Sequence, residues 1–304
     1  MKIYSTASSR LGIFGGGTDL EPYCLEFGGA VINMAINLRQ HITLQEGFNF
    51  ELPVDANPEF YLTMFDKYKI KSGISSHFDG YIKSGLGSSG AAGVCLMGAI
   101  NKKLNLGLSR HEIALNAWQH EIDMGIYTGK QDQFASAYGG LNYISFGEKV
   151  NVVKVTVPSF DEFLSWISLF YIGRGEKNYM TQKSFSKLDT RKKKYLDILK
   201  YITGIALPLF IVGEYQEIAE LLNIAWRYKK ESNKVTTSEI DKIYDLALKF
   251  GAIGGKICGS GGGGYMMFMC PPEKKNNLIK KLEENGIKNV DFGIDFNGLE
   301  VRTL

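Results

Sequence analysis

The stretch SGLGSSGAA at residues 84–92 is the most informative part of the sequence for predicting the fold. It predicts a glycine-rich loop that runs directly into a helix, which starts at Ser88 or Ser89 and ends near Leu104. Glycines let the backbone approach an anion closely, and the amides and dipole of a helix N-terminus attract negative charge. The stretch therefore indicates a phosphate site whose serine hydroxyls could reach a phosphate-bound Mg²⁺. The alternative is an ordinary capped helix after a tight turn.

Glycine is the unusual feature of the composition. The chain has 304 residues and 35 glycines, whereas a chain of this length has on average about 21. Proline does not accompany the excess, at 7 residues, which excludes a Pro/Gly-rich low-complexity chain. Fifteen of the glycines lie in three clusters, which we call clusters one (residues 11–19), two (84–92) and three (251–264). The surplus glycine is therefore expected in folded loops.

Charge, cysteine and hydropathy exclude several classes of protein. The net charge of +3 gives no nucleic-acid footprint, which needs a strongly basic, one-sided surface. The four cysteines are scattered without a CxxC pair, as expected in a reducing compartment. The longest uncharged stretch, Tyr201–Gly213, is too short to span a bilayer. We therefore expect a cytoplasmic protein with neither a membrane nor a nucleic acid as partner, and no apolar seam predicts an oligomeric state.

Helix and strand signals alternate irregularly along the chain. Capping boxes start helices at Ser109 with Glu112 and at Thr236 with Glu239. Mixed order without strict βαβ alternation predicts an α+β fold with two domains, 1–158 and 159–304. The remaining predicted elements are strands at 2–7, 29–46, 141–146, 167–172, 265–270 and near 288–302, and helices at 131–138, 188–205, 214–229, 237–250 and 272–285.

Two familiar glycine motifs fit poorly. The pattern GxGxxG occurs at 85–90 and again at 259–264. Dinucleotide binding also needs an acidic residue about 20 positions on, at the end of a second strand, but 105–109 lies between two predicted helices. Cluster three is followed by a strand instead of a helix, and no Lys-Ser/Thr pair completes a Walker A loop. A dehydrogenase or P-loop protein is the weaker interpretation.

In this order, the three clusters resemble the signature motifs of the GHMP small-molecule kinases. Cluster two resembles their ATP-phosphate loop, and cluster three resembles the glycine-rich loop that steadies it. A finer resemblance, to the D-glycero-D-manno-heptose 7-phosphate kinase branch, covers nearly the whole chain. It lies in RLGIFGGGTDL at 10–20, GKQDQFASAYGGLNY at 129–143, AWRYKK at 225–230 and VDF at 290–292.

The resemblance implies a fold, an activity and cofactors. The fold is the two-lobed GHMP kinase fold, with an ATP-binding domain of ribosomal-protein-S5-like type at 1–158 and a ferredoxin-like C-terminal domain at 159–304. The activity is transfer of the γ-phosphoryl group of ATP, with Mg²⁺, to the anomeric hydroxyl of a sugar, here D-glycero-D-manno-heptose 7-phosphate. The alternatives are an unphosphorylated fucose- or galactose-like hexose, or a nucleotide-binding protein with little kinase activity.

Matching positions give the expected catalytic and binding residues. Asp132 matches the family's catalytic aspartate, which takes or orients the proton of the acceptor hydroxyl, and Arg10 keeps it ionised and steadies the transferring group. By itself, Asp132 could simply complement a helix dipole. Asp19 matches a sugar-binding position but could equally cap a helix starting at Leu20. The implied ATP-binding residues are Lys83, Ser84, Gly85, Leu86, Gly87, Ser88, Ser89, Gly90, Gly259, Ser260, Gly261 and Gly262, and the implied substrate-binding residues are Gly16, Gly17, Thr18, Asp19, Arg174 and Lys177.

The magnesium ligands depart from the family pattern. The resemblance assigns Ser89 and a glutamate five residues before a glycine, but counting back from Gly125 reaches His120, with Glu121 next to it. Adjacent helical residues diverge by about 100°, and Mg²⁺ strongly prefers oxygen. Either the helix presents Glu121, or His120 contacts a metal-bound water, or His120 is an ordinary surface histidine. Lys83, Arg174 and Lys177 could equally be solvated.

Overall fold

The computed structural model describes residues 1–82, 84–173, 188–232 and 235–304. These residues form two compact units. Unit 1 comprises Met1–Leu11, Met34–Gly140 and Ile294–Leu304, and unit 2 comprises Gly12–Asn33 and Leu141–Gly293. The units interleave along the chain, whereas the boundary predicted near residue 158 divides the chain into two continuous halves. That boundary stays a prediction about domains.

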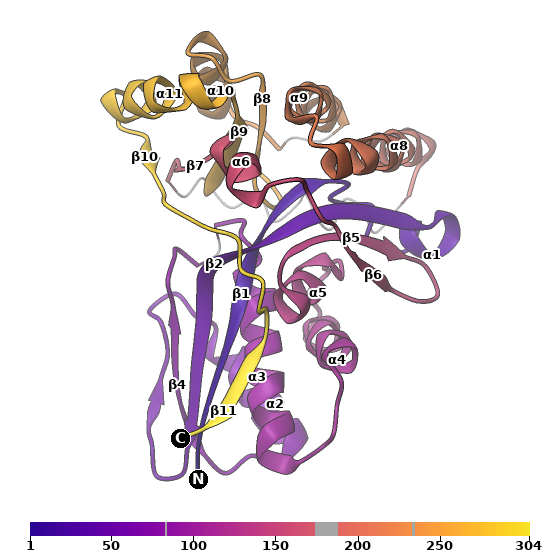
Figure 1. The fold of residues 1–304 in the computed structure, drawn as a ribbon. Coiled ribbons are helices and arrows are strands. Elements are labelled where there is room, and N and C mark those ends of the chain that lie inside the picture. Colours follow the sequence, from indigo (N-terminus) through magenta and orange to yellow (C-terminus); the bar gives the residue numbers. More distant parts are fainter. Residues whose placement is uncertain (83, 174–187, 233–234) are drawn as a thin grey trace. The chain divides into compact units, whose positions relative to one another are not determined.

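The sheet of unit 1 is built on the long strands β1 (Lys2–Phe14) and β2 (Gly29–Gln45), each of which supplies residues to both units. Its strand order is β11-β1-β2-β4-β3, with β3 at Phe50–Glu51, β4 at Gly73–Phe78 and β11 at Glu300–Thr303. β11 pairs antiparallel with the start of β1, so both chain ends lie together (Figure 1). The strand predicted at 2–7 extends seven residues further, to Phe14, so that Arg10 lies within β1.

The helices of unit 1 are α2 (Pro58–Tyr68), α3 (Ser88–Leu104), α4 (Arg110–Asp123) and α5 (Gln131–Tyr138). The predicted bounds of α3 and α5 are confirmed, as is the capping box at the start of α4. α3 is buried throughout 90–100 and packs against both α4 and α5. The small side chains of α3 allow this close packing on two sides. α2 was not predicted, although Asn57 caps it and Pro58 occupies its first turn.

Unit 2 contains a four-stranded antiparallel sheet with the order β10-β7-β9-β8. Residues 258–264 of cluster three form the loop between β8 (Gly254–Ile257) and β9 (Tyr265–Met269), and β8 itself lies within the cluster. Phe170 and Phe268 of the sheet pack with Trp226 and Tyr244 of the covering helices in one core. The elements of unit 2 are α1 (Tyr23–Phe27), β5 (Leu141–Phe146), β6 (Asn151–Lys154), α6 (Phe160–Ser165), β7 (Ile167–Tyr171), α8 (Thr190–Val212), α9 (Tyr215–Ser232), α10 (Ser238–Lys249), β8 (Gly254–Ile257), β9 (Tyr265–Met269), α11 (Pro272–Glu284) and β10 (Lys288–Asn289).

Two details of the predicted helices in unit 2 were wrong. The cap of α10 is Thr237, which accepts from the amide of Ile240, and not Thr236. The helix predicted at 188–205 continues past Pro208 to Val212 and ends at Gly213. Within the described residues, this helix, α8, is the one long and apolar enough to cross a membrane by length and composition. Buried core helices of globular proteins meet the same criterion, so the finding is weak evidence for a membrane span.

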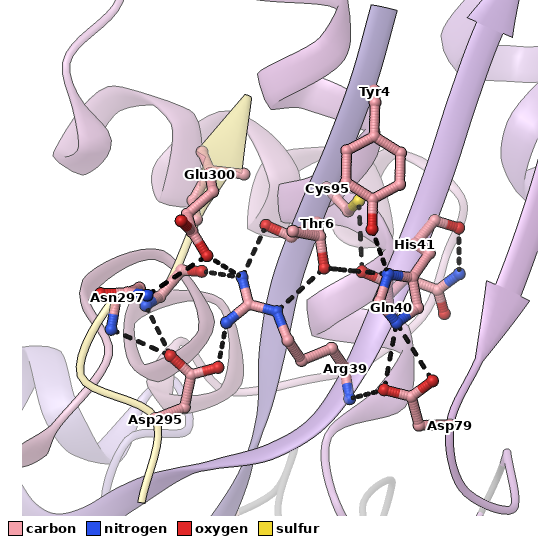
Figure 2. A network of polar contacts seen from close by, with 12 residues as sticks. Tyr4, Thr6, Arg39, Gln40, His41, Asp79, Cys95, Asp295, Asn297 and Glu300 are labelled. Atoms are coloured by element: carbon pink, nitrogen blue, oxygen red, sulfur yellow. Dashed lines mark hydrogen bonds and ion pairs between the residues drawn. The ribbon is translucent and has the colours of Figure 1, made fainter. Parts of the chain in front are cut away.

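The C-terminal segment of unit 1 is fastened by the side chain of Arg39 (Figure 2). Arg39 forms an ion pair with Asp295, donates from Nη2 to the carbonyl of Gly298 at 2.7 Å, and donates from Nε to Thr6 Oγ1 at 2.9 Å. The amide of Gly140, just beyond the end of α5, donates to the backbone carbonyl of Asp295 in the same segment at 2.6 Å. The partly buried guanidinium of Arg39 thus links β1, β2 and the C-terminal segment that borders α5.

Replacing this guanidinium should destabilise the protein. The Arg39→Met variant leaves Asp295, whose side chain is 5% exposed, without its ion-pair partner. Removing one partner of a buried pair typically costs about 3–5 kcal/mol. Urea unfolding measures the change, with Lys67→Met as the control because the Lys67–Asp123 pair is nearly half exposed and should contribute less than about 1 kcal/mol. Equal losses in the two variants would contradict the role of Arg39.

Candidate active site

Cluster two forms an uncapped helix start. Gly87 is the N-cap of α3, with φ of 71°, and no side chain in the described part of the chain caps the helix there. The hydroxyl of Ser84 donates to the carbonyl of Tyr81 and so closes the preceding turn. Ser89 is exposed in the first turn of α3. The first amides of a 17-residue helix therefore face an edge of unit 1 where an anion would be stabilised by hydrogen bonds and by the dipole.

Arg10 joins this loop to the aspartate of α5. Its Nε and Nη2 lie 2.8 and 2.7 Å from Asp132 Oδ1, and its Nη1 donates to the carbonyl of Gly85 at 2.6 Å. The amide of Arg10 also donates to the carbonyl of Leu86 at 2.9 Å. Both guanidinium contacts to the carboxylate are made with the same oxygen, Oδ1. The contacts keep the negative charge of Asp132 beside a fixed positive charge and orient its second oxygen, Oδ2.

Two glycines of cluster two allow Asp132 to lie against the loop. A Cβ on Gly87 would come within 3.1 Å of the carboxylate of Asp132, and its positive φ disfavours other residues. A Cβ on Gly90 would come within 2.7 Å of Asp132 Cβ, closer than real carbon contacts allow. The start of α3 and the start of α5 therefore touch through these glycines. The structure thus brings the predicted phosphate loop, Arg10 and Asp132 into one cluster in unit 1.

The packing of α4 gives His120 and Glu121 different surroundings. His120 is 3% exposed, so the expectation of a surface histidine was wrong. Its Nε2 lies 2.8 Å from the carbonyl of Phe60 in α2, and its ring packs edge-on against that phenyl ring. Burial lowers the pKa of His120, which favours a neutral ring. His120 therefore belongs to the contact between α4 and α2, and the adjacent Glu121 points in another direction.

Glu121 is buried next to the phosphate loop and Asp132. It is 1% exposed, and its Oε2 accepts from Gln133 Nε2 at 2.7 Å. Burial raises the pKa of Glu121 to about 7, and the charge of Asp132 adds to the increase, while interactions with Ser89, Gln133 and Thr128 lower the pKa. Within the described residues, Oε1 of Glu121 has no hydrogen-bond partner. A buried carboxylate with an unpartnered oxygen is costly unless a proton or a cation compensates it.

This donor set fits a magnesium ion bound together with nucleotide phosphates. Ser89 supplies an exposed hydroxyl and Glu121 a carboxylate oxygen without a partner. Mg²⁺ is usually held by one or two carboxylates together with substrate phosphates and water, not by a full protein cage. The described residues contain no group of three or more His, Cys, Asp or Glu side chains that could hold a metal ion. The choice of Glu121 over His120 as the ligand stays a prediction.

Residues 15–19 of cluster one form an ordered loop of unit 2 after the end of β1. The hydroxyl of Thr18 donates to the carbonyls of Gly15 and Ala30, both at 2.8 Å, and accepts from the amide of Ala30 at 3.0 Å. These backbone contacts engage the Thr18 hydroxyl, so any contact of Thr18 with a substrate would come from its backbone. Asp19 accepts from the amide of Gly17 at 3.1 Å and is 2% exposed. The interpretation of Asp19 as a helix cap was wrong, because α1 begins only at Tyr23.

Cluster three is also ordered within unit 2. The amide of Gly262 donates to the carbonyl of Val235 at 3.0 Å, and Lys229 donates to the carbonyl of Gly259 at 3.0 Å. Its glycines at 259 and 261–264 all have positive φ. The loop therefore needs glycine for its backbone path, whatever it binds. Among the remaining predicted site residues, Lys83, Arg174 and Lys177 lie outside the described residues.

Two buried side chains with clear contacts to the predicted site were not identified from the sequence. Gln133 follows Asp132 directly and is fully buried, where it donates to Glu121. Lys256 lies within cluster three, and its ammonium donates to the carbonyls of Gly12 and Ile13 at 2.7 and 3.2 Å. Their positions next to the glycine and aspartate motifs were the available signal. Their burial depends on tertiary packing and could not be predicted from these neighbouring motifs.

Comparison with known proteins identifies the family of the chain. A model described as the GHMP kinases N-terminal domain matches residues 56–140, and one described as the GHMP kinases C-terminal region matches residues 206–288. The chain is also 30% identical to the D-glycero-alpha-D-manno-heptose 7-phosphate kinase of Campylobacter jejuni, with 96% of each chain covered. The protein belongs to the GHMP kinase family. This GHMP kinase is therefore an ATP-dependent phosphotransferase with an alcohol group of a small molecule as acceptor, and the family typically uses Mg²⁺.

Solved structures agree with this assignment. The fold matches a D-glycero-D-manno-heptose 1-phosphate kinase of Bacteroides thetaiotaomicron with a TM-score of 0.79 and 25% identity, covering 99% of both chains. The predicted two-part α+β GHMP kinase fold is thereby confirmed. A more distant relative, the galactokinase of Thermococcus kodakarensis, is 26% identical over 59% of this chain and 59% of its own.

The raised pKa of Glu121 predicts a decline in stability with pH. In the folded protein the pKa is about 7, against an ordinary value of 4.5, so the folded state retains a proton that the unfolded state has lost. The resulting stabilisation is present below pH 4.5 and is lost as the pH rises to about 7, by roughly 3 kcal/mol in total.

Glu121→Gln removes this titration. Urea unfolding of both proteins in EDTA, at pH 5 and pH 8, should show the variant gaining about 2–3 kcal/mol relative to the unmodified enzyme across that interval. Glu273→Gln, at an exposed position, is the control and should show no such gain. Parallel pH profiles for the enzyme and the Glu121→Gln variant would contradict the raised pKa.

Proposed function

We propose that this GHMP kinase phosphorylates the anomeric hydroxyl of a sugar, and that D-glycero-D-manno-heptose 7-phosphate is its substrate. The observation that carries the chemistry is the Arg10–Asp132 pair, held at 2.7–2.8 Å against the uncapped start of α3. The choice of substrate is supported by the relative from Campylobacter jejuni, which the chain matches along almost its whole length.

In the proposed reaction, the amides at the start of α3 and the hydroxyls of Ser88 and Ser89 bind the phosphates of ATP. Asp132 Oδ2 accepts the proton of the acceptor hydroxyl, whose oxygen attacks the γ-phosphorus. The bond between that phosphorus and the β–γ bridging oxygen breaks, and ADP leaves with the electron pair. Arg10 contacts Asp132 Oδ1 through two nitrogens and so orients the carboxylate. Most of the acceleration comes from positioning and charge stabilisation, as is usual for phosphoryl transfer.

Ser89 and Glu121 would hold the magnesium ion that accompanies the nucleotide. When bound, this ion neutralises charge on the β- and γ-phosphates. Ionisation of Glu121, which burial disfavours, would be favoured by the adjacent cation. The alternative of a nucleotide-binding protein with little kinase activity was motivated by His120 at the expected glutamate position. The packing of His120 against Phe60, with Glu121 beside the loop, removes that motive.

Asp132→Asn tests the proposed base. The amide keeps the size of the side chain and can still contact Arg10, but it cannot accept the hydroxyl proton. We expect turnover to fall by about 10²–10⁴-fold while ADP affinity stays within about twofold of the unmodified enzyme. Steady-state ADP release and ADP titration measure the two quantities, and near-normal turnover would remove Asp132 from the role of base.

A substrate panel tests the proposed acceptor. ADP release with Mg-ATP should be fastest with D-glycero-D-manno-heptose 7-phosphate and much slower with the same heptose lacking its phosphate, or with galactose and fucose. A charge-assisted hydrogen bond to the 7-phosphate is worth about 1.5–3 kcal/mol, which corresponds to roughly 10–150-fold in kcat/KM. Equal kcat/KM for phosphorylated and unphosphorylated sugars would contradict the heptose phosphate assignment and favour the hexose alternative.

A further inference from the structure

The side chain of Gln133, next to the proposed base Asp132, is buried against Glu121. Consecutive helical residues diverge by about 100°, so Asp132 faces Arg10 while Gln133 turns into the protein and is fully buried. There its Nε2 donates to Glu121 Oε2 at 2.7 Å. α5 therefore directs one side chain to Arg10 of β1 and the next to Glu121 of α4.

The contact leaves two buried oxygens without donors. Within the described residues, neither Oε1 of Glu121 nor Oε1 of Gln133 has a hydrogen-bond partner, although both side chains are almost completely buried. Leaving a buried polar group unpaired costs about 1–3 kcal/mol. Two such oxygens on hydrogen-bonded neighbours indicate a ligand that can interact with both as a metal ion or a hydrogen-bond donor. A hydrated cation fits, because a carboxylate oxygen can bind it directly and an amide oxygen can accept a hydrogen bond from its water.

We propose that Gln133 is the positioning residue that holds Glu121 in the orientation required to bind the magnesium ion of the nucleotide. The hydrogen bond fixes Oε2 and leaves Oε1 as the oxygen available to the ion. This inference rests on the proposed function, in which Glu121 is a magnesium ligand. It adds that the ligand is held in place from α5, the same helix that carries Asp132, so one element positions both the metal ligand and the proposed base.

Metal binding, measured apart from activity, tests the proposal. Gln133→Met keeps the length of the buried side chain and removes its donor. Loss of such a supporting hydrogen bond typically weakens metal affinity about 10–100-fold. Mn²⁺ binding to the enzyme–ADP complex, followed by electron paramagnetic resonance of free Mn²⁺, should therefore weaken at least about tenfold. ADP affinity in EDTA should change less than about twofold. Gln133→Asn, which withdraws the amide by one methylene, gives a second variant with the same expected direction.

Ser136→Ala is the matched control. Ser136 is also fully buried on α5, and its hydroxyl lacks a partner among the described residues. Its removal should leave Mn²⁺ affinity unchanged, whereas equal weakening in this variant would show that any disturbance of α5 suffices and would overturn the proposal. Unchanged Mn²⁺ affinity in both Gln133 variants would overturn it as well.

A double-mutant cycle separates failure of this inference from failure of the proposed function. Glu121→Gln should weaken Mn²⁺ binding, and adding Gln133→Met should then cost less than about twofold more, because the two residues act as one unit. Additive losses would mean that Gln133 acts independently of Glu121, which overturns the positioning role alone. Unchanged Mn²⁺ affinity in Glu121→Gln would overturn the metal assignment itself, and the inference with it.

Discussion

The contact on which the site depends is the buried guanidinium of Arg10 between the carboxylate of Asp132 and the carbonyl of Gly85. Arg10 is 5% exposed, and charge removed from water to that extent must be paired and hydrogen-bonded. The pair satisfies this requirement with groups from three elements: β1, the loop before α3, and α5. Because these partners leave little freedom to the guanidinium, the relative positions of loop and carboxylate are fixed before any ligand binds. Such preorganisation is what phosphoryl transfer requires from a protein.

Glycine makes that contact geometrically possible. At Gly87 and Gly90 a Cβ would collide with Asp132, so the surplus glycine in cluster two permits contact within the protein as well as approach to a phosphate. The two roles are linked, since the loop that packs against Asp132 leads directly into a helix start at which no described side chain acts as a cap. In cluster three the reason differs, because a succession of positive φ angles sets the path of the loop. The sequence shows where glycine accumulates but not which of these constraints applies.

The sequence predicted the elements whose signals are local. The capping box at Ser109 and the glycine stop after α5 depend on neighbours within four residues, and both are confirmed. The orientation of α4 could not be obtained in this way. Whether His120 or Glu121 faces the loop depends on Phe60 of α2, a helix that the sequence analysis did not identify. The burial of Gln133 likewise depends on tertiary packing, because α5 lies against α4, where Gln133 contacts Glu121. Motif spacing located the site, whereas assigning its side chains required the tertiary packing of helices distant in sequence.

The proposed chemistry and the proposed acceptor recognition fall in different units. Arg10, cluster two, Glu121 and Asp132 all belong to unit 1, while cluster one belongs to unit 2, where Lys256 and Thr18 hold its backbone. Phosphate binding by helix amides is indifferent to the acceptor, so relatives with different acceptors can retain that machinery unchanged. The galactokinase aligns over 59% of this chain and the heptose phosphate kinase over 96% of it. Differences that select the sugar are therefore expected around cluster one and not in the phosphate loop.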